Sequence, residues 1–378
     1  MRVHQSKSVK RFIDEYMEIC SGIGSIFNNI DNFVDNSMKL SNIIMDDMLA
    51  YLSKKYTGKE FEDAVLANEI AFLMESASGL SIQNEFIHYM SMKLFKLAKV
   101  IDADDFRRSN RYLNDIKLDK CRESSKFELC EDKTDAWALF NYNTGVIDSR
   151  LAYMNVPRLA VFNKDFVSPC LNIKDTNEMW MSITPNEVYT MEKAISKSFG
   201  KVLTLGCGIG YFAYMSSLKE DVESVTIIEN DQEVIDMFNE CILPQFKTKD
   251  KIKLIKADAI DYMHELEDGL YDYCFADIWI GAIGIKDYFK VKEIGRNFKK
   301  MVIDYWIEDA FMMGLIDYVI PEVMSSISHV NFGGENSDYV HRLFKNVEIQ
   351  SDKDIVKYLN VDRMLKMVTN TKIIYNKN

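Results

Sequence analysis

Apolar residues recur at the spacing of a helix through the first third of the chain. One such stripe comprises Phe12, Tyr16, Ile19 and Ile23, and a later one comprises Phe86, Met90, Leu94, Leu97 and Ile101. The first proline is Pro157, so no proline interrupts a helix before that point. The spacing predicts four or five helices from about residue 7 to residue 118. We therefore assign residues 1–118 to an all-helical N-terminal domain whose apolar stripes form a core.

The pattern changes to short apolar runs after residue 118. Runs at 127–130, 136–140 and 159–162 are typical of strands, and turn-forming residues follow the second of them at 141–145. We expect a small β or mixed connector over residues 119–184.

A third pattern begins near Thr184. This residue suits a helix N-cap, Pro185 suits the first helical position, and Glu187 would complete a capping box. The helix should end near residue 198. Apolar runs at 201–205, 224–229, 252–256 and 272–277 then alternate with helical stretches, and 301–306 is a candidate fifth strand. Such alternation predicts an α/β fold with a doubly wound, Rossmann-like parallel sheet over residues 185–325, followed by a C-terminal extension over 326–378.

Charge and cysteine content narrow the classes of function. The formal net charge is −12, and a negative mean field repels nucleic acids and anionic lipid, so we expect neither broad nucleic-acid binding nor membrane association. The first ten residues are polar and basic, and no apolar run approaches the length of a membrane span. Seven cysteines without a CxxC pair and five scattered histidines predict reduced thiols, no metal site and a cytoplasmic location.

The candidate chemistry begins where the first strand of this sheet ends. Gly206, Gly208 and Gly210 alternate with Cys207 and Ile209 directly after Leu205. A strand, a glycine turn and a helix present backbone N–H groups and a helix N-terminus to a small ligand. The spacing is G-x-G-x-G, which differs from the G-x-G-x-x-G pattern of dinucleotide-binding proteins. This difference disfavours a nicotinamide dehydrogenase.

Acidic residues follow the next three predicted strands. Glu229 ends the second strand, where a carboxylate can accept hydrogen bonds from both ribose hydroxyls. Asp258 follows the third strand, where it can accept a bond from the amine of an adenine. Asp277 follows the fourth strand, at the edge of the sheet where substrate chemistry is carried out. Their order along the chain predicts a nucleoside-binding edge.

Residues 185–285 resemble the class I S-adenosylmethionine-dependent methyltransferases, because the glycine turn and the segments around Glu229, Asp258 and Asp277 match that family's first four motifs. The resemblance implies S-adenosylmethionine as cofactor and S-adenosylhomocysteine as product. It also implies contacts of the glycine turn with the methionine part, of Glu229 with the ribose and of Asp258 with the adenine. The cofactor-binding set it implies comprises Leu205, Gly206, Cys207, Gly208, Gly210, Glu229, Asn230, Asp258, Ala259 and Asp277.

The resemblance places Asp277 beside the sulfonium and the acceptor, which makes it the candidate catalytic residue that orients an amine or accepts a proton. Trp180, Tyr211 and Trp279 are candidates for shaping this pocket, with core packing as their other role. Residues 277–280 read Asp-Ile-Trp-Ile rather than the Asn/Asp-Pro-Pro-Tyr signature of base and glutamine methylation. We therefore expect a small-molecule acceptor.

Two other functions stay open. The layout of 185–281 also resembles spermidine-synthase-like aminopropyltransferases, whose cationic substrates would suit an acidic protein. Alternatively, the helical half is an interaction module and the Rossmann-like half is a non-catalytic protein that binds a nucleoside ligand. The sequence also leaves homo-oligomerisation open.

Overall fold

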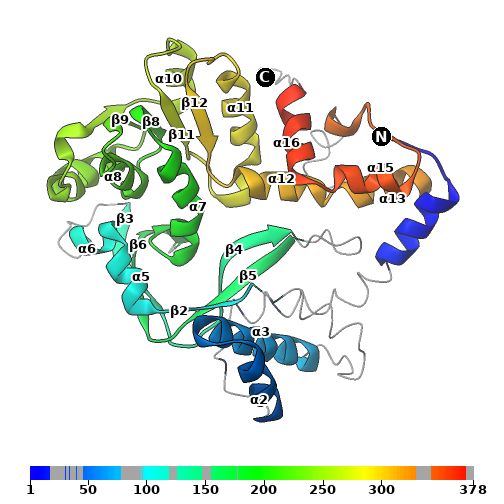
Figure 1. Cartoon of the computed structure of the whole chain (residues 1–378). Helices are drawn as coiled ribbons and strands as arrows, with labels where there is room; N and C mark the ends of the chain where they lie inside the picture. Colours follow the sequence, from blue (N-terminus) through cyan, green and yellow to red (C-terminus); the bar gives the residue numbers. More distant parts are fainter. Residues whose placement is uncertain are drawn as a thin grey trace. The chain divides into compact units, whose positions relative to one another are not determined.

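The computed structural model describes residues 1–17, 30, 34, 40, 46–77, 95, 97–118, 126–146, 155–176, 178–328 and 342–371 (Figure 1). The chain divides into two compact units. Unit 1 consists of Met1–Val100, Ala138–Val161 and Asp309–Asn378, and unit 2 consists of Ile101–Trp137 and Phe162–Glu308. This division differs from the predicted boundaries at residues 118, 184 and 325, because each unit is assembled from separate stretches of chain.

Unit 1 is mostly helical and contains short strands. Its helices with described bounds include α2 (Asp46–Lys55), α3 (Gly58–Ala77), α12 (Glu308–Ile316), α13 (Val319–Ser328), α15 (Asp352–Tyr358) and α16 (Val361–Asn370). Strand β1 (Arg2–Val3) pairs in parallel with β13 (Glu348–Ile349). Strands β2 (Lys99–Ile101), β5 (Asn155–Phe162) and β4 (Phe140–Val146) form a three-stranded sheet in that order.

The all-helical prediction for residues 1–118 is therefore wrong in part, since β1 and β2 lie within it. The described helices α2 and α3 confirm helical structure over much of 46–77. The predicted helical stripes at 19–23 and 86–94, and the turn expected near 332–336, lie outside the described residues.

The helical segment Glu308–Ile327 corrects the expectation that no run approaches the length of a membrane span. Among the described residues it is the one helical segment that is long and apolar enough to cross a membrane. Its most apolar stretch of 18 residues has a mean hydropathy of 1.3, and 44% of that stretch is buried within the structure. The core helices of soluble proteins satisfy the same criterion.

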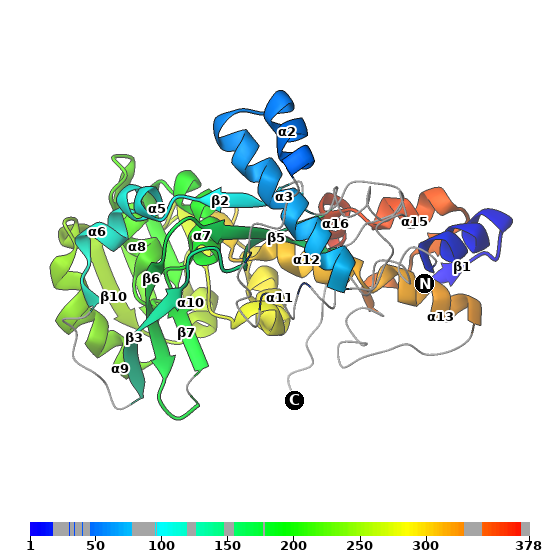
Figure 2. The ribbon, with the colours of Figure 1, turned by 90° about the horizontal axis from the view of Figure 1, so that it is seen from below.

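Unit 2 contains an antiparallel sheet and a parallel sheet. In the antiparallel sheet β3 (Phe127–Thr134), β6 (Phe166–Ile173) and β7 (Glu178–Ser182) run side by side (Figure 2). The short helices α5 (Ala103–Ser109) and α6 (Arg111–Asp115) precede it. Both helices begin at residues whose side chains accept a bond from the first turn, Asp102 and Asn110.

The cysteines are only partly reduced, contrary to prediction. Cys130 and Cys170 face each other across β3 and β6 and form a disulfide, and Cys241 is also disulfide-bonded. Cys207 and Cys274 are free, buried thiols. Cys20 and Cys121 lie outside the described residues.

The parallel sheet confirms the predicted doubly wound architecture. Its order is β10 (Ile252–Lys256), β9 (Val222–Glu229), β8 (Gly200–Leu205), β11 (Tyr273–Ala276) and β12 (Val302–Tyr305), with every pairing parallel. The strands begin and end within two residues of the predicted runs. All four residues of β11 are buried, as expected for a strand covered on both faces.

Helices and short turns connect these strands. The helices are α7 (Pro185–Lys197), α8 (Tyr211–Ser217), α9 (Gln232–Met237), α10 (Ala259–Glu265) and α11 (Ile285–Gly295), and the short turns are η2 (Phe238–Ile242), η3 (Leu243–Gln245), η4 (Lys249–Lys251) and η5 (Gly281–Gly284). After β8 the chain adds β9 and β10 on one side, then returns to place β11 on the other. Open sheets bind ligands at the carboxyl ends of the strands where such a reversal occurs.

Candidate functional site

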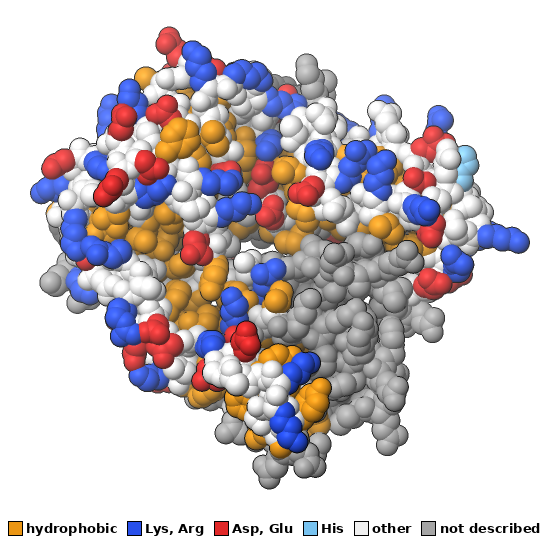
Figure 3. Space-filling model, viewed as in Figure 1, with side chains coloured by type: hydrophobic (Ala, Val, Ile, Leu, Met, Phe, Trp, Pro, Cys, Tyr) orange, Lys and Arg blue, Asp and Glu red, His pale blue; other side chains and the backbone are white. Residues whose placement is uncertain are grey.

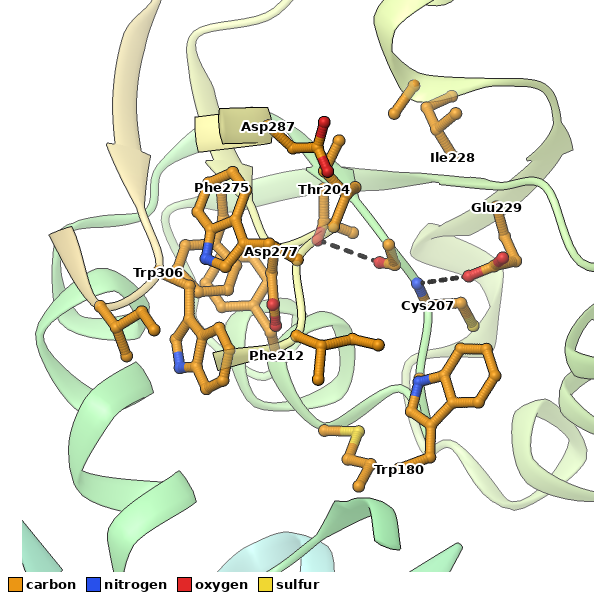
Figure 4. Close-up of a pocket in the computed structure, with 18 of the residues that line it drawn as sticks. Trp180, Thr204, Cys207, Phe212, Ile228, Glu229, Phe275, Asp277, Asp287 and Trp306 are labelled. Atoms are coloured by element: carbon orange, nitrogen blue, oxygen red, sulfur yellow. Dashed lines mark hydrogen bonds between the residues drawn. The ribbon is translucent and has the colours of Figure 1, made fainter. Parts of the chain in front are cut away.

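A cavity of about 750 Å³ opens at the carboxyl ends of the parallel strands (Figure 4). That volume lies within the range of about 300–1,000 Å³ typical of sites for small molecules. Each strand contributes a residue at its end or just after it, and these residues are Gly206, Glu229, Asp258, Asp277 and Trp306. Helix α7 and strand β7 supply further lining residues, among them Glu187 and Met181. One edge of the sheet therefore collects side chains spread over more than a hundred residues of sequence.

The glycine turn forms one wall of this cavity. Gly206 has a φ of +97°, and a Cβ atom there would collide with the backbone carbonyl of Asp277. Gly208 has a φ of +49°, and a Cβ there would collide with the side chain of Met181. Both positions therefore require glycine for conformation and for space. The first glycine allows the ends of β8 and β11 to lie in direct contact.

Most of the predicted cofactor-binding residues line this cavity. Those that line the cavity are Gly206, Cys207, Gly208, Glu229, Asn230, Asp258, Ala259 and Asp277. Leu205 and Gly210 are not among the lining residues. Leu205 is fully buried in β8, and Gly210 is the left-handed residue at the start of α8.

Glu229 is held in place by the backbone. Its Oε1 accepts hydrogen bonds from the N–H groups of Asn230 (2.8 Å) and Asp231 (2.9 Å), and its Oε2 accepts one from Cys207 (3.0 Å) (Figure 4). A carboxylate offers about four acceptor sites, so Oε2 retains one for a ligand. The carboxylate that ends β9 is thus fixed against the glycine turn before any ligand binds.

Asp258 has two roles available, one for each oxygen. Its Oδ1 accepts hydrogen bonds from the N–H groups of Ile260 (2.8 Å) and Asp261 (3.0 Å), which caps helix α10. Because Oδ1 accepts both bonds, Oδ2 is the oxygen that can serve a ligand in the cavity.

Asp277 extends from the end of β11 into the cavity (Figure 4). Its backbone N–H donates to the carbonyl of Leu205 (2.9 Å), while its carboxyl accepts no hydrogen bond from the described part of the chain. Burial raises the pKa of this carboxyl well above its usual range, and the nearby Glu187 raises it further. Such a group can hold or accept a proton near neutral pH.

Glu187 corrects a sequence prediction. Thr184 is the N-cap of α7, but its side chain makes no capping bond, so the predicted capping box is absent. The Glu187 carboxyl lines the cavity instead, and burial raises its pKa to about 7. Helix α7 leads directly into β8 and runs back along the sheet, so its first turn lies at the carboxyl edge of the strands. An acidic residue in that turn was the signal that could have placed Glu187 in the site.

Aromatic residues complete the walls. The indole N–H of Trp306 donates to the hydroxyl of Thr190 (2.9 Å), which in turn donates to the backbone carbonyl of Glu187 (2.9 Å). This chain of bonds ties the end of β12 to the turn that carries Glu187. Trp180 and Trp279 also line the cavity, whereas Tyr211 is buried and accepts a hydrogen bond from Asn110 (3.2 Å). Of the three predicted aromatic candidates, Tyr211 is a core residue.

No family model and no curated protein matches this chain. Solved structures match parts of it. A dimethyladenosine transferase from Plasmodium falciparum is 24% identical with a TM-score of 0.24, and the match covers 34% of this chain and 43% of that protein. An S-adenosylhomocysteine-bound methyltransferase from Podospora anserina is 20% identical with a TM-score of 0.27, and the match covers 39% of this chain and 65% of that protein. In both cases the chain spans less than two thirds of the matched protein.

A precorrin-8w decarboxylase from Methanobacterium thermoautotrophicum is 18% identical with a TM-score of 0.26. That match covers 40% of this chain and 74% of that protein. We derive the function from the cavity itself.

Proposed function

We propose that this protein is an S-adenosylmethionine-dependent methyltransferase that acts on a small-molecule acceptor. One observation carries the proposal. Four strand ends bring a glycine turn, the fixed carboxylate of Glu229, the half-used carboxylate of Asp258 and the buried carboxyl of Asp277 into one cavity. A glycine turn followed by an acid at the end of the next strand is the arrangement by which open parallel sheets bind nucleosides, and the resemblance to class I methyltransferases implies the roles of Asp258 and Asp277.

The residues present fit this cofactor. Glu229 Oε2 has one acceptor site left for a ribose hydroxyl, and Asp258 Oδ2 is available to accept from the adenine amine. The glycine turn lines the same cavity through Gly206, Cys207 and Gly208, next to these two carboxylates. When bound, the cofactor would supply a methyl carbon activated by its positively charged sulfur.

The protein's own contribution is binding, alignment and proton handling. Glu229 and Asp258 would hold the nucleoside, and the rigid contact between Gly206 and the backbone of Asp277 fixes the acceptor end relative to it. Alignment of two reacting groups supplies a large share of the rate enhancement in such reactions. Asp277 would receive or orient a proton of the acceptor.

Isothermal titration calorimetry with S-adenosylhomocysteine tests the proposal. We expect the wild-type protein to bind, and Glu229→Ala to weaken binding by about ten- to 100-fold. The one acceptor site left on the Glu229 carboxylate takes one hydrogen bond, and a hydrogen bond to a charged group contributes about 1.5–3 kcal/mol, where about 1.4 kcal/mol corresponds to a factor of ten. Glu223→Ala is the matched control, because Glu223 is an exposed acid on the same strand. Thermal unfolding of each variant shows whether it is folded, and Glu229→Gln provides a second, shape-conserving variant. Absence of binding by the wild type would refute the proposal.

A second candidate is an aminopropyltransferase. The observation in its favour is that two acids in the cavity, Glu187 and Asp277, lack hydrogen-bond donors from the described residues, which suits a cationic substrate. Titration with decarboxylated S-adenosylmethionine separates the two reactions. An affinity at least tenfold above that of S-adenosylmethionine would favour aminopropyl transfer, and the reverse order would favour methyl transfer.

A further inference from the structure

We infer that the acceptor is a cationic amine held between Glu187 and Asp277 in this cavity. This inference rests on the proposed function and names the substrate class of the same site. It begins from a comparison of all the acids that line the cavity, namely Glu187, Glu229, Asp258, Asp277 and Asp287.

Three of these acids already have donors. Glu229 accepts three backbone N–H bonds, Asp258 accepts two, and Asp287 accepts one from Lys290 (2.7 Å). The carboxyls of Glu187 and Asp277 accept no hydrogen bond from the residues that the structure describes. Lys290, a basic side chain in the lining, is already engaged with Asp287. The cavity therefore contains two acids whose charge the protein leaves uncompensated.

The two acids lie close enough to act on each other. The negative charge of Glu187 is one cause of the raised pKa of Asp277, and burial is the larger cause. Two neighbouring buried carboxyls are costly to ionise together, and a bound cation removes that cost. Glu187 comes from helix α7 and Asp277 from the loop after β11, so a ligand between them would bridge two elements.

The surrounding walls favour an amine with an aliphatic or aromatic body. Phe212, Phe275, Trp279 and Trp306 line the same cavity. Indole and phenyl faces attract ammonium groups as well as alkyl chains. A carboxylate or phosphate in this place would meet two acids and would be repelled.

The acids also account for the proton that an amine must lose. A bound ammonium would transfer one proton to the carboxylate pair, which would leave the nitrogen lone pair free to accept a methyl group. Glu187 or Asp277 would keep that proton. The cofactor, when bound, would supply the methyl group and retain the electron pair of its broken bond to sulfur, so charge and atoms would balance without a further reactant.

Calorimetry of the protein saturated with S-adenosylhomocysteine tests this inference, with n-pentylamine as the probe and 1-pentanol and pentanoate as isosteric controls. We expect only the amine to bind. Glu187→Gln and Asp277→Asn should each weaken amine binding by at least tenfold, and Glu187→Gln should leave S-adenosylhomocysteine binding within about twofold. Glu192→Gln, an exposed acid on the same helix, is the matched control.

Proton release gives a second readout. The amine stays charged below about pH 10, whereas Glu187 gains a proton below pH 7. The affinity should therefore rise between pH 6 and pH 8. Binding at pH 7 should release protons, as measured in buffers of different ionisation enthalpy, and Glu187→Gln should lose this release. The other titratable groups that face this region are Glu229, Asp258, Asp277, Asp287 and Lys290.

The outcomes separate the two proposals. If S-adenosylhomocysteine does not bind, the proposed function fails. If it binds, but the amine does not bind or binds no better than 1-pentanol, the amine inference fails and the proposed function stands. Equal amine affinity in wild type and Glu187→Gln would also overturn the inference.

Discussion

Substitution of Glu187 by Gln should stabilise the protein at alkaline pH and have little effect at acidic pH. Burial raises the pKa of this carboxyl from about 4.5 to about 7. The native protein therefore binds more protons than the unfolded chain between these two values. Stability falls with pH wherever the native state binds the extra proton, so Glu187 destabilises the fold progressively from pH 4.5 to pH 7.

The size of the effect follows from the shift. A shift of about 2.5 units at about 1.4 kcal/mol per unit gives roughly 3 kcal/mol of destabilisation above pH 7. Glu187→Gln removes the ionisation while keeping the shape of the side chain. The variant should therefore unfold at nearly the same urea concentration as wild type at pH 4.5, and at a clearly higher one at pH 8.

Urea unfolding at a series of pH values, followed by tryptophan fluorescence, measures this difference. Three of the four tryptophans lie in the wall of the cavity, so the signal reports on unit 2. The exposed Glu192→Gln variant should show no pH-dependent difference from wild type. A stability difference for Glu187→Gln that stays constant from pH 4.5 to pH 8, or a variant less stable than wild type at pH 8, would refute the reasoning.

Three further outcomes are expected. Gly206→Ala should destabilise unit 2 by about 2–4 kcal/mol in urea unfolding, because a Cβ there would collide with the backbone of Asp277. Gly281→Ala, also at positive φ but with no atom near the added Cβ, should cost about 1 kcal/mol. Equal costs for the two variants would contradict the packing argument. Thr184→Ala should change the free energy of unfolding by less than about 0.5 kcal/mol, because the Thr184 side chain makes no capping bond. Asn360→Ala removes a bond to a backbone N–H of α16 and should cost about 1 kcal/mol. A larger cost for Thr184→Ala than for Asn360→Ala would mean that Thr184 does cap α7. Asp258→Asn should keep the melting temperature, since Asn caps a helix equally well, while lowering S-adenosylhomocysteine affinity about tenfold in calorimetry, and unchanged affinity would exclude this residue from the adenine site.

The parallel sheet could be predicted because each of its strands is visible in the sequence as a short apolar run. Strand β11 is apolar along its whole length and is buried on both faces, which makes a short continuous run with few alternatives. The ends of such runs are also the ends of the strands. For that reason Glu229, Asp258 and Asp277 could be placed at one edge of the sheet before the structure was known.

Glu187 is assigned by sequence to a capping box and not to the site, because a local rule gives a complete explanation for it. Thr184, Pro185 and Glu187 satisfy the capping pattern of a helix start, yet the carboxyl lies in the cavity. The local sequence allows Glu187 either to cap the helix or to face the cavity, and contacts with the rest of the fold favour the second orientation.

The division into units escaped prediction for a different reason. Strands β1 and β13 are two residues long and are separated by most of the chain. Strands this short show no alternation of polar and apolar residues, and their pairing depends on long-range contacts. Composition and periodicity therefore predict one helical domain over residues 1–118, whereas in the structure β1 near the start of the chain pairs with β13 near its end.

The contact between Gly206 and the carbonyl of Asp277 has a consequence for changing the specificity of this protein. The turn at Gly206 and the backbone carbonyl of Asp277 determine how far the proposed nucleoside wall lies from the Asp277 carboxyl. The side chain of Ile280 lines the same cavity and is not among the atoms nearest to Gly206. It can be exchanged to enlarge or narrow the proposed acceptor space while these two walls keep their spacing, so selectivity and alignment are adjustable independently in this fold.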